Sequence, residues 1–478
     1  MGERRMTNKK EGNNLRLLER LFKIKENGSE VKTEIIGGLT TFVTVAYVLL
    51  VIPNILKIGG MNSEGLVGDE AAKLLMTNDP LIASAFASTC LGATIGTLIM
   101  AFKANLPFVL APGIGLTAFF SYNVCLKLGY SWQQGLAAVF ISGLIFIVIT
   151  LTSIREKIIE SIPRNMKLAI TAGIGLFIAL IGLKSGGIVV ANPGTLVAFG
   201  DFTNKAVILT LIGIVIMCIL VARKVKGAML IGIIITTLIG IPMGVTQLDS
   251  SIKIFSLPHI GQTFFAMDFK GLLTHNGTGI IGALISILMV VITLSLVDLF
   301  DTIGTLLGTA QRSGMLDSEG NVRNLRKALE SDAIGTTIGS ILGTTTLTTV
   351  VESAAGISEG ARTGLHNVIV ATLFILSLFF SGIVGIIPSS ATSPALIIVG
   401  VLMVGVVKDI DFEDFTEAVP AFFTIAMMPF SYSIANGIAV GIIFYPLMKL
   451  FTGKRKEVSF ILYILAALFI LRFILLPD

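Results

Sequence analysis

Long apolar runs separated by short polar gaps recur from residue 33 almost to the C-terminus. A helix needs about 20 predominantly apolar residues to cross the hydrocarbon core of a bilayer, and most of these runs approach or exceed that length. Ordinary soluble domains do not sustain such runs one after another. The pattern therefore predicts an all-α polytopic membrane protein with about 14 spanning segments.

The expected segments form two series. The first comprises Thr33–Leu56, Leu81–Phe102, Pro107–Leu128, Leu136–Thr152, Lys167–Leu183, Ala206–Val221 and Ala228–Val245. The second comprises Gly279–Ala310, Ala333–Thr344, Gly343–Gly364, His366–Ile387, Pro394–Val407, Phe415–Pro429 and Ser433–Leu450. A last apolar run, Phe460–Leu475, follows, and the sequence leaves open whether it spans the membrane or lies in the interface.

The third segment of each series is broken. Pro107, Pro112 and Gly113 interrupt the first of these segments, and a run rich in Thr and β-branched residues, 344–351, interrupts the second. Seven crossings in each series give the two halves opposite orientations. Inverted repeats with discontinuous helices are the architecture of many transporters, with the substrate site at the breaks. The alternative interpretation is two kinked helices without a ligand.

Basic residues in the polar gaps predict the orientation, because loops rich in Lys and Arg stay on the cytoplasmic side. The N-terminal tail is net basic, and its stretch Leu15–Ile24 fits either an interfacial amphipathic helix or a solvated tail. We expect a cytoplasmic tail at 1–33, a first repeat at 34–245 and an extracellular loop at 246–278. A second repeat at 279–451 and a C-terminal apolar segment at 452–478 complete this division.

Composition and charge narrow the function classes. The chain is 54% hydrophobic and 14% charged, with a net charge of +5. Its basic residues lie in short gaps beside apolar segments and form no continuous stripe, so nucleic acid is not an expected partner. Its 3 cysteines all fall in apolar segments, which gives neither a disulfide framework nor a metal spacing. No P-loop, zinc motif or nucleophile–base pattern is present, so we expect no cofactor and no enzyme activity.

Three acids stand apart from the polar gaps: Asp298, Asp301 and Glu352. Asp298 and Asp301 are three residues apart on one helical face, and Glu352 follows the break of the tenth segment. Charged groups inside a membrane are costly and are functional candidates by default. The alternative for each is a polar contact that only holds neighbouring helices together.

These acids and the broken helices predict the class of ligand. The N-terminus of a half-helix offers unpaired N–H donors, and a carboxylate accepts hydrogen bonds. Together they suit a flat ligand with donors and acceptors at its edge, such as a nucleobase, and a carboxyl kept from water also suits proton coupling. An inorganic anion would be expected to meet Arg or Lys at this depth, whereas a cationic substrate remains open on charge alone.

Five stretches resemble the guanine/hypoxanthine permeases of the AzgA-like branch of the nucleobase–cation symporter (xanthine/uracil permease) superfamily. They are Glu34–Tyr47, Ala111–Tyr122, Leu296–Thr305 (LVDLFDTIGT), Thr348–Ile357 (TTVVESAAGI) and Ala418–Ile425. The resemblance implies fourteen spans in two inverted repeats of seven, with core and gate domains and short strands in the third and tenth spans. It further implies uptake of purine bases with protons across the plasma membrane, by a homodimer with a cytoplasmic N-terminus.

The resemblance also implies the site residues. Asp298 and Glu352 would bind the base, Asp301 would be a supporting or proton-linked acid, and all three carboxyls are candidates for proton coupling. Gly115, Phe119 and Ser353, beside the two breaks, complete the expected substrate-binding set with Thr117. The family usually has Asn where this chain has Thr117, and an amide donates and accepts at once in a way that a hydroxyl cannot fully copy. Which purine is carried therefore stays open, as do another nucleobase such as uracil or xanthine and an uncoupled facilitator or channel.

Overall fold

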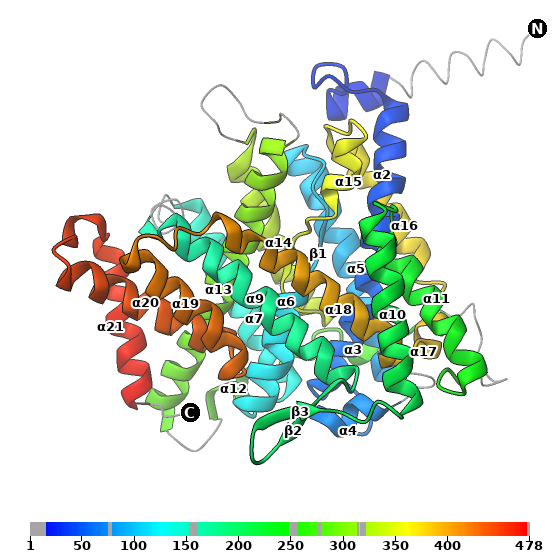
Figure 1. Cartoon of the computed structure of the whole chain (residues 1–478). Helices are drawn as coiled ribbons and strands as arrows, with labels where there is room; N and C mark the ends of the chain where they lie inside the picture. The colour runs from blue at the N-terminus through cyan, green and yellow to red at the C-terminus, as the bar shows by residue number, and fades with distance from the viewer. Residues whose placement is uncertain are drawn as a thin grey trace, which may run out of the picture.

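The computed structural model describes residues 16–74, 79–152, 161–247, 257–274, 279–312, 315 and 322–475, and it is a bundle of helices around a small central strand pair (Figure 1). Among these residues, 7 helices are long and apolar enough to cross a membrane. Shorter apolar helices complete the bundle. The predicted polytopic helical class is confirmed.

The first half of the chain contains the following elements. They are α2 (Val31–Val45), α3 (Val48–Ile58), α4 (Gly68–Lys73), α5 (Pro80–Ile99), η1 (Met100–Ala104), β1 (Leu110–Pro112), α6 (Ile114–Ala118), η2 (Phe119–Lys127), α7 (Trp132–Leu151), α9 (Arg164–Ser185), β2 (Val189–Asn192), β3 (Leu196–Phe199), α10 (Lys205–Ala222) and α11 (Ala228–Met243). A connection with η3 (Ile260–Gln262) and α12 (Phe269–Thr274) follows.

The second half repeats the scheme. Its elements are α13 (Gly279–Arg312), α14 (Leu325–Leu342), β4 (Leu347–Thr349), α15 (Ser353–Ser358), α16 (Gly364–Ser377), α17 (Ser381–Ile386), α18 (Ser389–Val404), η5 (Gly405–Asp409), α19 (Phe415–Phe430), α20 (Ile434–Phe451), η6 (Arg455–Glu457) and α21 (Phe460–Leu475). Most predicted segments are present with ends shifted by a few residues.

The two broken segments meet through their strands. β1 and β4 pair antiparallel, with Ala111 opposite Thr348. Further backbone bonds, Gly113 N–H to Thr346 O at 3.2 Å and Val350 N–H to Val109 O at 3.1 Å, extend the pairing on both sides. Non-helical backbone at membrane depth is tolerated only where protein or a water-filled cavity satisfies it, and here each break satisfies the other. The expected short strands are confirmed.

The helices pack in two groups. In one, α14 packs on α5 and α7, and α16 packs on α2 and α5. In the other, α9 packs against α18 and α19, α19 against α20, and α10 against α11 and α18. The first group holds both strands and both half-helices, so it corresponds to the expected core. The second corresponds to the expected gate.

Three segment boundaries differ from the prediction. The first segment divides into α2 and α3 at Tyr47, where the N–H groups of Leu49 and Leu50 bond the carbonyls three residues earlier, as in a tight turn, before the four-residue pattern resumes. The eleventh divides into α16 and α17. The ninth was predicted from Ala333, but α14 begins at Leu325, so the expected loop Gln311–Asp332 was too long. The charged residues in the first turns of α14 resemble a polar loop in the sequence.

The last apolar run forms α21 with the predicted bounds and packs on α20. Leu462, Ala466 and Phe469 are buried against the bundle, whereas Phe460 and Ile474 are exposed. This helix therefore has one packed face and one apolar outer face suited to lipid. The hairpin β2–β3 was not predicted; it lies with α4 at the end of the bundle opposite the start of α2 (Figure 1).

Candidate functional site

Glu352 lies at the centre of the broken region. It directly precedes α15 and is separated from the end of β4 by two residues, so its position is set by the strand pair. The hydroxyl of Tyr47 donates a hydrogen bond of 2.7 Å to Glu352 Oε1. Glu352 is partly exposed, and its neighbour Val351 is 60% exposed. The carboxyl is therefore held in place by the α2–α3 junction, on a residue that is partly exposed.

The other half-helix, α6, faces a carboxyl from α13. A methyl group placed on Gly113, the residue before α6, would lie 3.6 Å from Asp301 Oδ2 and 2.7 Å from the Thr348 methyl. Asp301 is partly buried and hydrogen-bonds the Thr348 side chain. Its charge also interacts with that of Glu352. Glycine at 113 thus lets the strand pair and the Asp301 carboxyl approach closely.

Asp298 lies one turn before Asp301 on α13 and is more deeply placed. Only 3% of its surface is exposed, whereas Asp301 and Glu352 are both partly accessible. The structure therefore brings the three predicted acids into one region, with unequal access. The roles predicted for them in binding and proton coupling remain predictions.

A fourth buried acid, Asp332, was missed by the sequence analysis. The Thr302 hydroxyl donates to Asp332 Oδ1 at 3.0 Å and lies 2.8 Å from the Thr348 hydroxyl. Asp332 is 0% exposed and sits in α14. A line of hydrogen-bonded side chains therefore runs from Asp301 through Thr348 and Thr302 to Asp332. A predicted helix start at Leu325 would have indicated Asp332 as a buried acid, because the residue then lies two turns inside the helix.

Thr117 joins the two broken segments. Its hydroxyl bonds Gly113 O at 2.8 Å and the Thr345 hydroxyl at 2.7 Å, and the residue is fully buried. It therefore tethers α6 to the chain entering β4. These contacts give Thr117 a structural role, and its predicted role as a substrate contact stays a prediction.

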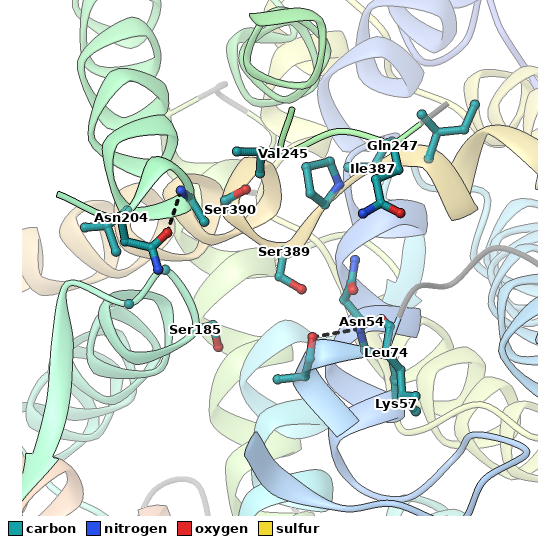
Figure 2. A pocket seen from close by; sticks show the side chains of 17 residues that line it. Asn54, Lys57, Leu74, Ser185, Asn204, Val245, Gln247, Ile387, Ser389 and Ser390 are labelled. Carbon is teal, nitrogen blue, oxygen red and sulfur yellow. Dashed lines mark hydrogen bonds between the residues drawn. The ribbon is translucent and has the colours of Figure 1, made fainter. Parts of the chain in front are cut away.

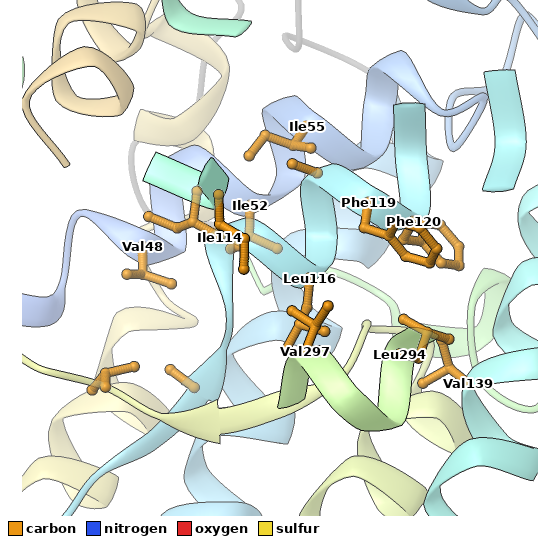
Figure 3. Close-up of a cluster of buried hydrophobic side chains, with 14 of the residues drawn as sticks. Val48, Ile52, Ile55, Ile114, Leu116, Phe119, Phe120, Val139, Leu294 and Val297 are labelled. Carbon is orange, nitrogen blue, oxygen red and sulfur yellow. The ribbon is translucent and has the colours of Figure 1, made fainter. Parts of the chain in front are cut away.

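The remaining predicted site residues pack around the breaks. The Ser353 hydroxyl accepts from Val109 N–H at 3.0 Å. A methyl group on Gly115 would lie 2.9 Å from the Ile174 side chain of α9, so Gly115 permits close contact between core and gate. Phe119 lies among apolar side chains with Phe120 (Figure 3). Substrate contact stays a prediction for these three residues.

The start of α16 is held by a buried acid that the sequence analysis placed at a segment end. Glu34 is 0% exposed and accepts from the backbone N–H groups of Arg362 (2.8 Å), Thr363 (3.4 Å) and His366 (3.1 Å). The His366 ring bonds the Thr41 hydroxyl at 2.8 Å. These bonds fix α2 to the segment that follows α15. They therefore help to hold Glu352, which directly precedes α15, in position.

We expect Tyr47→Phe to weaken substrate binding about tenfold, since a hydrogen bond to a charged group contributes roughly 1.5–3 kcal/mol and about 1.4 kcal/mol is a factor of ten. The substitution leaves the buried ring and removes only the hydroxyl that orients Glu352. Equilibrium binding to the purified protein measures the effect. Tyr445→Phe, at a tyrosine bonded to Glu417 on α19, is the matched control and should bind normally. Unchanged affinity in Tyr47→Phe would show that Tyr47 does not position the site.

Comparison with known proteins identifies the chain. The Permease family, represented by xanthine and uracil permeases, matches residues 32–440. The chain belongs to this family. It is 41% identical over 461 residues to the guanine/hypoxanthine permease PbuG of Bacillus subtilis, covering 96% of this chain and 100% of that protein. It is 38% identical over 458 residues to the adenine permease AdeP of Escherichia coli, covering 96% of each.

Two solved transporter structures share the fold of this permease. The transmembrane domain of the cyanobacterial bicarbonate transporter BicA superposes with a TM-score of 0.61 at 15% identity, covering 86% of this chain and 97% of that domain. SLC26A9 superposes with a TM-score of 0.57 at 12% identity, covering 93% of this chain and 70% of that one. The family and its relatives are membrane permeases, which confirms the predicted superfamily and the inverted-repeat fold and makes the chain a transporter rather than an enzyme.

Proposed function

We propose that this permease is a proton-coupled secondary active importer of purine nucleobases such as hypoxanthine, guanine or adenine. Its relatives named as guanine/hypoxanthine and adenine permeases support the substrate class. The observation that carries the proposal is the position of Glu352, a partly exposed residue whose carboxyl Tyr47 holds at the point where two paired strands interrupt the helices. A carboxylate in that position can accept an N–H from the edge of a purine.

Glu352 and Asp298 bind the base in this proposal, and Asp301 carries the proton. Support for Asp301 comes from its position: its charge interacts with Glu352, and its carboxyl starts the line through Thr348 that leads to Asp332. Protonation of Asp301 would remove the repulsion between two nearby carboxylates and favour Glu352 as the ionised acceptor. Loss of that proton would weaken the hold on the base.

The proposed setting is the plasma membrane, with the N-terminus in the cytoplasm and the protein as a homodimer. The basic N-terminal tail and the alternation of basic gaps support this orientation. Import then carries the base from the β2–β3 side of the bundle towards the side on which α2 begins.

Uptake of radiolabelled hypoxanthine, guanine and adenine, with and without an uncoupler, tests the function. Accumulation against a gradient that the uncoupler abolishes is the expected result. Uptake that survives the uncoupler would make the protein an uncoupled facilitator. Preference for uracil or xanthine would overturn the purine assignment.

Two substitutions on α13 separate binding from coupling. We expect Asp298→Asn to reduce hypoxanthine affinity at least about 100-fold. The substitution removes a charge-assisted hydrogen bond to the base and leaves the donor of that bond without its acceptor. Asp301→Asn should keep affinity within about tenfold and lose accumulation driven by an imposed pH gradient. Purified protein gives the affinities and proteoliposomes give the accumulation, with Asp201→Asn, at an exposed loop acid, as the control. If Asp298→Asn lost only accumulation and Asp301→Asn lost affinity, the proposed roles of the two acids would be exchanged.

A further inference from the structure

A cavity with several polar side chains in its lining lies at the end of the bundle opposite the start of α2. It has a volume of about 270 Å³ and is enclosed by the end of α3, the segment after α4, the end of α9, the start of α10, the segment after α11 and the start of α18 (Figure 2). It is therefore lined from both the core and the gate groups. Asp298, Asp301 and Glu352 are not among its lining residues.

Two side chains in this cavity have unmet hydrogen-bonding capacity. Within the described part of the chain, Asn54 Oδ1 and Ser390 Oγ have no hydrogen-bond partner, although the two residues are only 7% and 6% exposed. The Asn54 amide nitrogen is already committed to Leu50 O at 3.1 Å. Buried polar atoms without partners destabilise a fold, so their persistence at a cavity indicates a ligand or solvent that bonds them. The cavity thus presents one acceptor and one hydroxyl to an occupant.

The charge of the lining favours a neutral occupant. Among the described residues that line the cavity there is no Asp or Glu, and its lysine, Lys57, donates to the backbone carbonyls of Ala72 (3.3 Å) and Leu74 (2.9 Å). Ser185, Ser389 and Gln247 add neutral polar groups. Ligand pockets are commonly about 300–1,000 Å³, so a cavity near the lower end suits a single small ring system.

The cavity lies along the helix that also supports the main site. Tyr47, which bonds Glu352, directly precedes α3, and Asn54 follows seven residues later on that helix. At 1.5 Å per residue, the two positions are about 10 Å apart along the axis. A solute that moves between the core and the gate towards Glu352 would meet Asn54 and Ser390 first.

We propose that this cavity is an outer station for the transported base, in which Asn54 Oδ1 accepts a ring N–H and the Ser390 hydroxyl bonds a ring nitrogen or carbonyl. The proposal rests on the proposed nucleobase transport and adds a second binding position to it. The station holds the base before the core moves, and Glu352 then receives it. Because Asn54 and Ser390, the two proposed partners of the base, are both neutral, the station binds more weakly than the Glu352 site.

Cysteine protection in intact cells tests the station. Ser390→Cys is combined with Cys218→Ser, because Cys218 is exposed whereas Cys90 and Cys125 are buried. The cells are treated with a membrane-impermeant maleimide over a range of hypoxanthine concentrations. We expect labelling to slow about tenfold when hypoxanthine reaches roughly nine times the station's Kd, since the free fraction falls as 1/(1 + [L]/Kd).

The same measurement in a Glu352→Gln background separates local occupancy from a conformational effect. Protection that persists there supports the station, because that variant lacks the main site. Protection that disappears there, or a Ser390→Cys side chain that does not react from outside, would overturn the proposal. Thr203→Cys, on the exposed loop before α10, is the control and should react equally with and without hypoxanthine.

A second variant tests the proposed acceptor. Asn54→Leu in the Ser390→Cys protein should shift half-protection to at least about tenfold higher hypoxanthine. Equal protection with and without Asn54 would overturn its role. If the parent protein takes up no purine, the proposed function fails; if it takes up purine and protection is absent, only the station fails.

Discussion

Replacing Glu352 with glutamine is expected to reduce hypoxanthine affinity at least about 100-fold and to abolish uptake. The amide keeps the volume but removes the charge, and it presents N–H donors to a purine edge that also presents N–H. A lost charge-assisted bond together with an unpaired buried donor accounts for about 3 kcal/mol, which corresponds to roughly a factor of 100. Binding of radiolabelled hypoxanthine to purified protein measures the loss. Expression and elution as a single species show that membrane insertion is intact.

Glu359→Gln is the matched control for this substitution. Glu359 follows the last residue of the same short helix, α15, and pairs with Lys226. Ion pairs near the surface contribute little to stability, so this variant should bind and transport normally. Normal hypoxanthine affinity in Glu352→Gln would refute the assignment of the site, whatever the control does.

Removing the buried Glu34 carboxyl should produce the largest loss of stability. Glu34→Ala leaves the N–H groups of Arg362, Thr363 and His366 without their acceptor in a fully buried position. Each unsatisfied buried group costs about 1–3 kcal/mol, so the start of α16 should detach from α2. We expect a lower melting temperature in detergent and a large reduction in the amount of folded protein.

Glu30→Ala controls for the loss of an acid near the start of α2. Glu30 is exposed and its side chain makes no capping bond, so its removal should leave the melting temperature unchanged. A melting temperature of Glu34→Ala equal to that of the parent would show that water replaces the carboxyl. Purine added to Glu34→Ala should raise its melting temperature if Glu352 is still in place, because a ligand that binds only the folded state stabilises it.

Parts of the site could be predicted because they depend on local sequence. Pro112 followed directly by Gly113, shortly after Pro107, is a local signal for a helix break, and Glu352 is conspicuous as an acid beside a Thr-rich break. Asp332 could not be found in this way, because the helix that contains it begins with charged residues that look like a loop. In the sequence, Glu34 lies at the end of an apolar segment. Only the structure shows that it accepts hydrogen bonds from three N–H groups at the start of α16, which is distant in the chain.

The sequence alone determined the class of the protein, because burial in lipid requires long apolar helices and makes each internal acid stand out. It also located the two breaks at Gly113 and Glu352. Only the tertiary structure decided which groups meet there. β1 pairs with β4 across more than 200 residues of chain, and Tyr47, between α2 and α3, donates a hydrogen bond to Glu352. Such contacts depend on how two repeats pack against each other, and neither repeat encodes its partner's position locally.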